Sequence, residues 1–258
     1  MRQLVIISGA SGGFGRAFAL SISNNKIPLF PLSNTKYVLL GRNIQSTNET
    51  KELLLNQQDG CEDQVSVMQM DLSNVDNVKN QTKDLLDKYN GVYDRVLLLN
   101  NAGDIGELKY VHELSEDLNL VQDHMTVNVT SCFIINSLFL DTFKSIDKII
   151  VNVSSLLSTV PMSCWSLYCT SKSARKMMHE VIAREHKEKL RVLNYQPGPL
   201  EGTNITQKIK TSGMSDEETQ KAFSNMTYIS TSDSADKLCK ILSDDTFENG
   251  SSIDYFDE

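Results

Sequence analysis

The strongest constraint on the fold is a regular alternation of short apolar runs with longer amphipathic segments. The runs are rich in β-branched residues and stand at Leu4–Ile7, Tyr37–Leu40, Val65–Met70, Arg95–Leu99, Lys148–Val153, Leu190–Tyr195 and Ile253–Phe256. Their near-continuous hydrophobicity is typical of strands buried on both faces of a parallel sheet. The segments between them have an amphipathic pattern, as in Val75–Tyr89, Leu118–Phe143 and Ser166–Glu185. The alternation therefore predicts an α/β fold, a doubly wound parallel sheet of about seven strands flanked by helices.

The length of the chain agrees with one domain of this kind. It has 258 residues, and a domain of that size buries roughly three quarters of its unfolded surface without a disulfide or a metal. No linker-like shift in composition divides residues 1–258, so we predict a single domain. The connection Asn24–Lys36, which contains Pro28, is unusually long. The polar stretch 202–225 is predicted to be a mobile, partly helical excursion, either a lid over a substrate or a plain surface loop.

Charge excludes one large class of function. The formal net charge is −8, with 25 Lys and Arg against 33 Asp and Glu. Sequence-independent binding of nucleic acid needs a basic surface, so we expect no nucleic-acid partner. The first apolar run, Leu4–Ile7, is too short for a signal-peptide core or a membrane span. We therefore expect a cytoplasmic protein that makes no contact with a membrane.

Cysteine and histidine usage gives no sign of a metal site. The odd cysteine count and the absence of CxxC favour reduced thiols in a reducing compartment. The histidines are scattered, with no HxxxH and no neighbouring cysteine, which makes a zinc site improbable. The residues concerned are Cys61, Cys132, Cys164, Cys169, Cys239, His112, His124, His179 and His186.

A glycine-rich turn follows the first apolar run directly. Such a turn between a strand and a helix lets the backbone approach a pyrophosphate, and the helix N-terminus offers it free N–H groups. The absence of GK[ST] disfavours a nucleoside triphosphatase. The position of the turn instead predicts a dinucleotide-binding Rossmann fold. The residues expected to hold the cofactor here are Gly9, Ser11, Gly12, Gly13, Phe14 and Gly15.

The end of the second run indicates which dinucleotide is bound. Proteins that prefer NAD usually have an acidic residue there for the ribose hydroxyls. This chain has Gly41-Arg42-Asn43 and no carboxylate. A guanidinium suits the 2′-phosphate of NADP through charge-assisted hydrogen bonds. We therefore predict NADP(H), with Arg42 and Asn43 at the phosphate; a solvated arginine in a turn is the alternative.

Taken together, the motifs resemble those of the short-chain dehydrogenase/reductase family along nearly the whole chain. The sequence Asn100-Asn101-Ala102-Gly103 follows the fourth run, and Ser155 stands thirteen positions before Tyr168 of a YxxxK motif that ends at Lys172. The resemblance implies that Asp71, Leu72, Asn101, Ala102, Gly103, Leu200 and Thr203 contact the cofactor. The chain departs from the family pattern at one position. Where the family usually has a threonine this chain has Gly202, and Thr203 comes one residue later.

The same resemblance implies a catalytic group of Ser155, Tyr168, Lys172 and Asn128. Tyr168 and Lys172 lie four positions apart, on one face of a predicted helix. We expect the ammonium and the oxidised nicotinamide to lower the pKa of the phenol, which then protonates a carbonyl oxygen. Ser155 would hydrogen-bond that oxygen, and Asn128 would hold a water that relays protons toward Lys172. A surface contact is the alternative for an isolated Tyr/Lys pair.

The segments Arg191–Leu200 and Ile253–Asp257 narrow the resemblance to family members that reduce tetrahydropterin side-chain carbonyls with NADPH, as homodimers, in tetrahydrobiopterin synthesis. This implies a pterin substrate that contacts Ser155, Tyr168 and Gly198, with its guanidine-like edge on Asp254. A solvated charge in an acidic tail is the alternative for Asp254. Two other functions stay open: a carbonyl reductase of broad specificity, and a non-catalytic NADPH-binding sensor or scaffold.

Overall fold

The computed structural model describes residues 1–24, 30–57, 62–186, 188–212 and 216–257. Three features of the sequence lie partly or wholly outside this range. They are Pro28 of the long connection, the thiol of Cys61, and residues 213–215 of the polar excursion.

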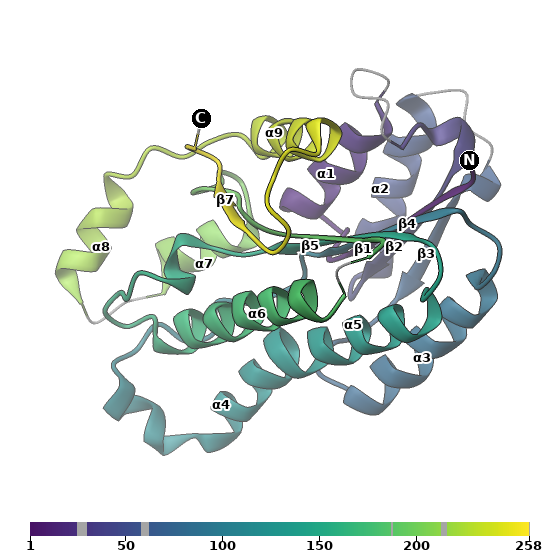
Figure 1. The fold of residues 1–258 in the computed structure, drawn as a ribbon. Coiled ribbons are helices and arrows are strands. Elements are labelled where there is room, and N and C mark those ends of the chain that lie inside the picture. Colours follow the sequence, from purple (N-terminus) through teal and green to yellow (C-terminus); the bar gives the residue numbers. More distant parts are fainter. Residues whose placement is uncertain (25–29, 58–61, 187, 213–215, 258) are drawn as a thin grey trace.

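Seven parallel strands form one sheet, in the order β3-β2-β1-β4-β5-β6-β7 (Figure 1). Their bounds are β1 Gln3–Ser8, β2 Thr35–Gly41, β3 Val65–Gln69, β4 Arg95–Asn100, β5 Asp147–Val153, β6 Leu190–Gln196 and β7 Ser252–Asp254. Every predicted run thus corresponds to a strand, and the doubly wound α/β fold is confirmed. The order reverses between β1 and β4, and in open α/β sheets that reversal marks the crevice where ligands bind.

Helices cover both faces of the sheet. The α-helices are α1 Gly13–Ser23, α2 Ile44–Gln57, α3 Val75–Tyr89, α4 Leu118–Met125, α5 Ser131–Thr142, α6 Ser166–Glu185, α7 Asn204–Thr211, α8 Glu217–Ser224 and α9 Thr231–Asp244. Short 3-10 turns are η1 Leu32–Asn34, η2 Glu62–Gln64, η3 Val111–Glu116 and η5 Leu156–Ser158. Side-chain caps fix several helix starts, as where Asn74 accepts the N–H of Asn77 at the beginning of α3.

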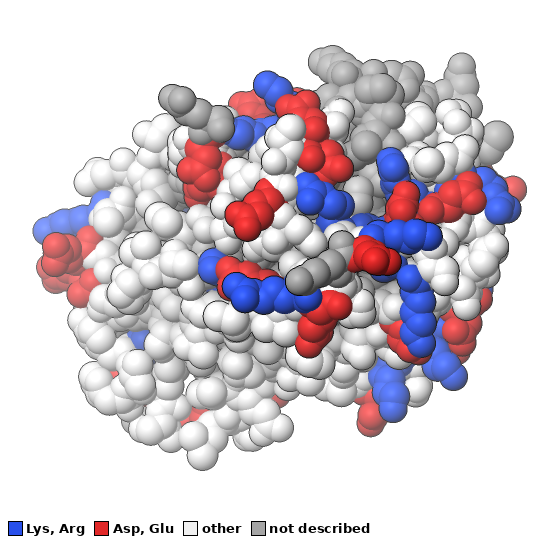
Figure 2. All heavy atoms as spheres, in the orientation of Figure 1, with Lys and Arg blue, Asp and Glu red and all other residues white. Residues whose placement is uncertain are grey.

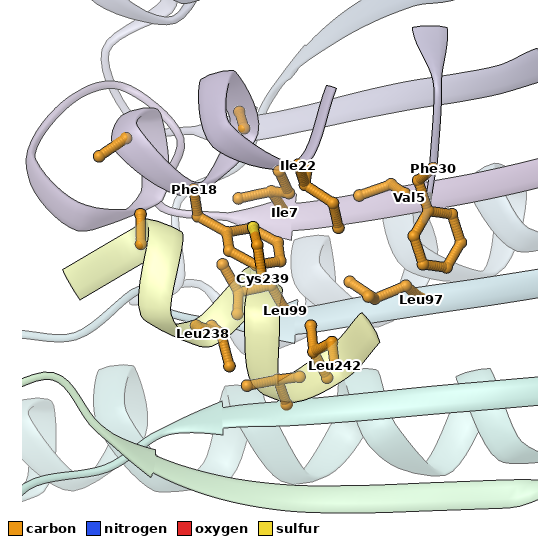
Figure 3. Packing of buried hydrophobic residues seen from close by; sticks show 14 of the residues in the cluster. Val5, Ile7, Phe18, Ile22, Phe30, Leu97, Leu99, Leu238, Cys239 and Leu242 are labelled. Atoms are coloured by element: carbon orange, nitrogen blue, oxygen red, sulfur yellow. The ribbon is translucent and has the colours of Figure 1, made fainter. Parts of the chain in front are cut away.

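The apolar core has two layers, one on each side of the sheet. Alternate residues of the central strands face α1 and α9, where Phe18, Ile22 and Leu238 are buried against Ile7 and Leu99 (Figure 3). On the opposite face, α3, α5 and α6 pack on the other residues of the same strands. This explains why the runs are continuously apolar: each strand is covered on both sides.

Strand bounds shift by one or two residues from the predicted runs, and two of the predicted segments end or divide differently for a local reason. The last strand ends at Asp254 instead of Phe256, because the Asp254 carboxylate accepts the N–H of Phe256 at 3.0 Å and turns the chain. The segment Leu118–Phe143 is divided into α4 and α5 by a π-helical turn, Thr126–Thr130. Such a turn inserts an extra residue into the helix and is often found at functional sites.

The two helices of the 202–225 excursion, α7 and α8, lie beyond the carboxyl ends of the strands, at the left of Figure 1. Figure 2 shows acidic and basic side chains interspersed over much of the same face. The part over α4 and the beginning of α6 shows few charges. Because it contains α7 and α8, the 202–225 excursion is partly helical, as predicted.

Candidate active site

A cleft of about 1630 Å³ opens at the carboxyl ends of the strands. It is lined by nearly all of the predicted cofactor, catalytic and substrate residues: Gly9, Ser11, Gly12, Gly13, Phe14, Arg42, Asn43, Asp71, Leu72, Asn101, Ala102, Gly103, Ser155, Tyr168, Lys172, Gly198, Leu200, Thr203 and Asp254. Two predicted residues, Gly15 and Asn128, do not line it. Parallel strands bring these residues together, because each motif follows the end of its own strand.

The glycine turn has the geometry that a dinucleotide requires. Gly9 and Gly13 have φ values of +70° and +52°, which suit glycine. A Cβ on Gly15 would lie 2.2 Å from the carbonyl oxygen of Gly9, so α1 packs on the turn only because residue 15 has no side chain. A Cβ on Gly12 would meet nothing within 4 Å, which leaves open space at the start of α1. A cradle of backbone N–H groups at a helix N-terminus fits a pyrophosphate.

The loop after β4 is tied to this turn. Asn101 donates from Nδ2 to the carbonyl oxygens of Ser8 and Gly9, both at 3.0 Å. In return, the Ser8 hydroxyl accepts the backbone N–H groups of Asn101 and Ala102. The glycine turn and the Asn101–Gly103 loop therefore form one rigid floor under the cleft.

Charged residues line the cleft just beyond the ends of β2 and β3. Arg42 is exposed at the end of β2 and lines the cleft. The Asp71 carboxylate accepts the N–H and hydroxyl of Ser73, which lowers its pKa, and the charge of Arg42 lowers it further. The Asp71 carboxylate therefore stays ionised near neutral pH.

Ser155, Tyr168 and Lys172 meet at the floor of the cleft. Tyr168 and Lys172 share a face of α6, and the Lys172 ammonium lies 5.4 Å from the centroid of the phenol ring. The same ammonium donates to the carbonyl oxygen of Val153 at 2.6 Å. Ser155 caps η5 by accepting the N–H of Leu157 at 3.2 Å, and it lies close enough to Tyr168 to lower the pKa of the phenol. The predicted spacing therefore produces a compact serine–phenol–ammonium group.

Burial, and not Lys172, has the largest effect on the pKa of Tyr168. Burial raises the pKa of Tyr168 to about 12, while the hydrogen bond from Ser155 and the charge of Arg175 lower it. The pKa of Lys172 is itself well below its usual value, because the ammonium is buried and faces Arg175. The expected lowering of the phenol pKa by Lys172 is therefore not seen: burial raises this pKa, and the cation that lowers it is Arg175. Arg175, which the sequence reading did not treat as a site residue, is the nearby cation that opposes this burial effect.

Asn128 lies in the π-helical turn and is fully buried. Its Oδ1 accepts the backbone N–H of Asp104 at 2.9 Å, and its Nδ2 donates to the carbonyl oxygen of His124 at 3.0 Å. The side chain therefore joins α4 to the loop after β4 and does not line the cleft. Its assignment as the residue that holds a relay water stays a prediction.

The predicted substrate residues also line the cleft. Gly198 has φ +75°, and a Cβ there would lie 2.7 Å from the Ile229 side chain. Asp254 is half-buried at the end of β7 and lines the cleft. Thr203 caps α7 by accepting the N–H of Thr206 at 3.1 Å, so the shift of one residue from the family pattern places a helix start beside the glycine turn.

The helices α7 and α8 close one side of the cleft. Lys208 of α7 pairs with Asp104, in the loop after β4, at 3.2 Å. Phe223 of α8 stacks on Trp165, with ring centroids 4.9 Å apart, and Trp165 in turn meets Tyr168 edge-on. The sequence analysis missed Lys208 and Phe223, because contacts between distant loops leave no local pattern. The prediction of a substrate lid stays open, and these contacts favour it.

This arrangement of glycine turn, Asn-Ala-Gly loop and YxxxK helix on a doubly wound sheet defines a class of dinucleotide-dependent oxidoreductase. The family model described as short chain dehydrogenase matches residues 3–213, so the chain belongs to the short-chain dehydrogenase family and is an oxidoreductase. Among curated proteins, it is 33% identical over 261 residues to the sepiapterin reductase of Rattus norvegicus, a match that covers 98% of this chain and 95% of the relative. The resemblance predicted from the sequence motifs is therefore confirmed, both to the family and to its sepiapterin reductases.

More distant relatives widen the comparison. The benzil reductase ((S)-benzoin forming) of Bacillus subtilis (strain 168) is 28% identical over 224 residues, covering 83% of this chain and 81% of the relative. A crystal structure of an alcohol dehydrogenase from Thermococcus sibiricus, complexed with 5-hydroxy-NADP, superposes with a TM-score of 0.75 at 19% identity and covers 98% of this chain and 96% of that one. The structural match shows that the fold is shared.

Across 1–24, 30–57, 62–186, 188–212 and 216–257, no helix has the length and apolarity needed to cross a bilayer. Within the same ranges, histidine, cysteine and acidic side chains do not gather in groups of three that could hold a metal ion.

Proposed function

We propose that the chain is an NADPH-dependent reductase of pterin side-chain ketones, such as sepiapterin and 6-pyruvoyl-tetrahydropterin, in the last reduction of tetrahydrobiopterin synthesis. One observation carries the proposal. Ser155, Tyr168 and Lys172 line a single cleft together with the glycine turn and the Asp254 carboxylate. The similarity to rat sepiapterin reductase along 98% of the chain supports it.

The residues of the cleft fit NADP(H). The glycine turn and the start of α1 would hold the pyrophosphate, and Asp71 with Leu72 would contact the adenine. Arg42, beside Asn43, would bind the 2′-phosphate through charge-assisted hydrogen bonds from its guanidinium. Leu200 and Thr203 would contact the nicotinamide side, and Lys172 its ribose. These residues offset a net charge of −8, which by itself would repel an anionic cofactor.

The chemistry follows from the serine–phenol–ammonium group. When bound, NADPH supplies a hydride to the carbonyl carbon of the substrate. Tyr168 donates its phenolic proton to the carbonyl oxygen, so the O–H bond of the tyrosine breaks and a new O–H bond forms on the product alcohol. Ser155 hydrogen-bonds the same oxygen while negative charge develops on it. Solvent then returns a proton to the phenolate, by a route that includes Lys172 and the turn around Asn128.

Asp254 would anchor the substrate. A pterin presents its 2-amino group and a ring N–H side by side, and an ionised carboxylate accepts both. Gly198 would let the flat ring approach the backbone, because a side chain there meets Ile229. This anchoring would bring the side-chain ketone to Tyr168, at the opposite side of the pocket.

We further propose a cytoplasmic homodimer formed through α5 and α6. Three large apolar side chains are exposed on these helices: Phe133 at 59%, Met177 at 59% and Val181 at 42%. The neighbouring Met178 packs into the core instead. An apolar face of this kind suits a symmetric interface between two copies of the chain.

A carbonyl reductase of broad specificity is the second candidate. The match to the Bacillus benzil reductase, 28% identical over 83% of this chain, favours it. A non-catalytic NADPH-binding scaffold is less well supported, since a sensor has no need of a proton donor beside the nicotinamide.

The decisive comparison is between a pterin and a small diketone, with and without the Asp254 charge. The variant Asp254→Asn retains an oxygen that can accept the Phe256 N–H but removes the charge. It should lower kcat/KM for sepiapterin about 10- to 100-fold, the effect of losing a charge-assisted pair of hydrogen bonds. Activity toward a small diketone should change little. Asp257→Asn, a nearby carboxylate on the same cleft, is the matched control; equal losses on both substrates would favour the second candidate.

A further inference from the structure

Arg175 is a large, charged side chain at the centre of the molecule. It is 1% exposed and heads the fully buried side chains in size. It lies on α6, three residues after Lys172 and seven after Tyr168, so the three side chains share one face of the helix. Its position beneath the catalytic group suggests a role beyond packing.

The guanidinium is held by neutral acceptors only. Nε donates to Oδ1 of Asn152 at 2.9 Å, Nη1 to the carbonyl oxygen of Ala102 at 2.8 Å, and Nη2 to that of Asn100. Among the residues that the structure describes, no carboxylate oxygen lies within 4.0 Å of it. Burying an unpaired charge is costly, and hydrogen bonds to amides satisfy its N–H groups without cancelling its field. The positive charge therefore acts on its surroundings.

These bonds join α6, which carries Tyr168, to the Asn101–Gly103 loop and the end of β4. Asn100 and Ala102 flank Asn101, which is bonded to the glycine turn at Ser8 and Gly9. Arg175 donates hydrogen bonds to the residues on either side of Asn101. Arg175 thus connects α6, which carries the phenol, to the loop that holds the glycine turn.

The groups that face Arg175 and Tyr168 leave the guanidinium as the dominant charge. Burial keeps the nearby cysteines and histidines neutral near pH 7, by raising the pKa of the thiols and lowering that of the imidazoles; they are Cys132, Cys169, His124 and His179. Lys172 has a lowered pKa, partly because Arg175 is close. The Asp104–Lys208 pair at the rim combines one charge of each sign. A guanidinium, by contrast, stays protonated.

We propose that Arg175 is a positioning residue of the carbonyl reduction: it fixes the Tyr168 helix against the cofactor floor, and its buried charge stabilises the phenolate that forms when Tyr168 gives up its proton. The inference rests on the proposed function, in which Tyr168 is the proton donor. It assigns to Arg175 an electrostatic effect that the YxxxK pattern assigns to Lys172. The pKa of Tyr168 agrees with this assignment, since the cation that lowers it is Arg175 and not Lys172.

The test measures the ionisation of Tyr168 directly. The ultraviolet difference between the intact chain and its Tyr168→Phe variant, each saturated with NADP+, isolates the phenolate of Tyr168 during a pH titration. Arg175→Met removes the charge and retains the length of the side chain. It should lower the phenolate fraction at a given pH about tenfold or more, the effect of one pKa unit. The pH profile of alcohol oxidation with NADP+ should move to higher pH by the same amount.

Two further variants separate charge from shape. Arg175→Lys keeps the charge and should hold the titration midpoint near that of the intact chain. Asn152→Asp leaves Arg175 in place and sets a carboxylate against its Nε, so it should raise the midpoint as Arg175→Met does; it also serves if Arg175→Met does not fold.

Unchanged midpoints in Arg175→Met and Asn152→Asp would overturn the proposal, as would equal shifts in Arg175→Lys and Arg175→Met. If Tyr168→Phe alters neither the titration nor turnover, the proposed function fails first, and the inference fails with it.

Discussion

A buried histidine under the active site makes the stability of this chain depend on pH in a defined way. His179 is fully buried on α6. Its Nδ1 lies 2.7 Å from the carbonyl oxygen of Arg175, so this nitrogen must carry the proton, and Nε2 then accepts from the Asn100 amide at 3.1 Å. A second proton, on Nε2, would make the imidazole N–H and the Asn100 amide N–H face each other as two donors. Burial accordingly lowers the pKa of His179 from 6.5 to about 3.

The sign of the effect follows from proton binding. Below pH 6.5 the unfolded chain takes up a proton that the folded chain does not bind until pH approaches 3. Unfolding is therefore favoured increasingly as pH falls through this window, and the His179 contribution is fully present only above it. Each pKa unit corresponds to about 1.4 kcal/mol. Between pH 7 and pH 5, His179 alone should cost the folded state about 2 kcal/mol.

Urea unfolding of the intact chain and of His179→Gln, at pH 7 and pH 5, measures this contribution. Glutamine does not titrate, so the difference in unfolding free energy between the two proteins should shrink by about 2 kcal/mol at the lower pH. His112→Gln, at an exposed position, controls for the loss of an imidazole as such. A difference that stays constant between the two pH values would refute the assignment of His179 as a buried, neutral hydrogen-bond acceptor.

Two further predictions concern the cofactor. Gly15→Ala places a Cβ 2.2 Å from the Gly9 carbonyl; it should weaken NADPH binding more than about tenfold in a fluorescence titration and lower Tm, through overpacking of about 1–3 kcal/mol. Gly12→Ala should keep the Tm of the intact chain, because its Cβ meets nothing within 4 Å and any residue adopts its φ of 177°. Equal losses of Tm in Gly15→Ala and Gly12→Ala would contradict the packing argument. Arg42→Gln should reduce the preference for NADPH over NADH, measured as a ratio of kcat/KM, by about 10- to 100-fold. An unchanged ratio would remove Arg42 from the phosphate site.

The sheet could be predicted from the sequence because each strand is covered on both sides. A strand such as β4, with buried Val96 to Leu99, gives a continuous apolar run whose length limits it to a strand. Most of the site was predicted for a related reason: its motifs follow strand ends, and parallel strands carry those ends to one edge. The errors fell where side chains redirect the backbone, at Asp254 and at the π turn around Asn128.

The polar layer beneath the site could not be predicted from the sequence. Asn100, Asn152 and Asn194 stand opposite one another across β4, β5 and β6, but register is not visible in single strands. Arg175 and His179 on α6 have the spacing of a polar helix face, which ordinarily predicts exposure to solvent. Only the row of asparagines shows that this face is buried. Helical spacing from Tyr168 and Lys172 was the one available signal for Arg175.

The central claim is that Tyr168 delivers the proton in an NADPH-dependent carbonyl reduction. The most direct measurement is the steady-state rate of NADPH oxidation with sepiapterin, for the intact chain and for Tyr168→Phe, together with NADPH affinity for both. The account predicts that kcat falls about 10²- to 10⁴-fold, the usual contribution of a positioned acid, while NADPH binding is unchanged. Turnover by Tyr168→Phe within a few-fold of the intact chain would contradict it.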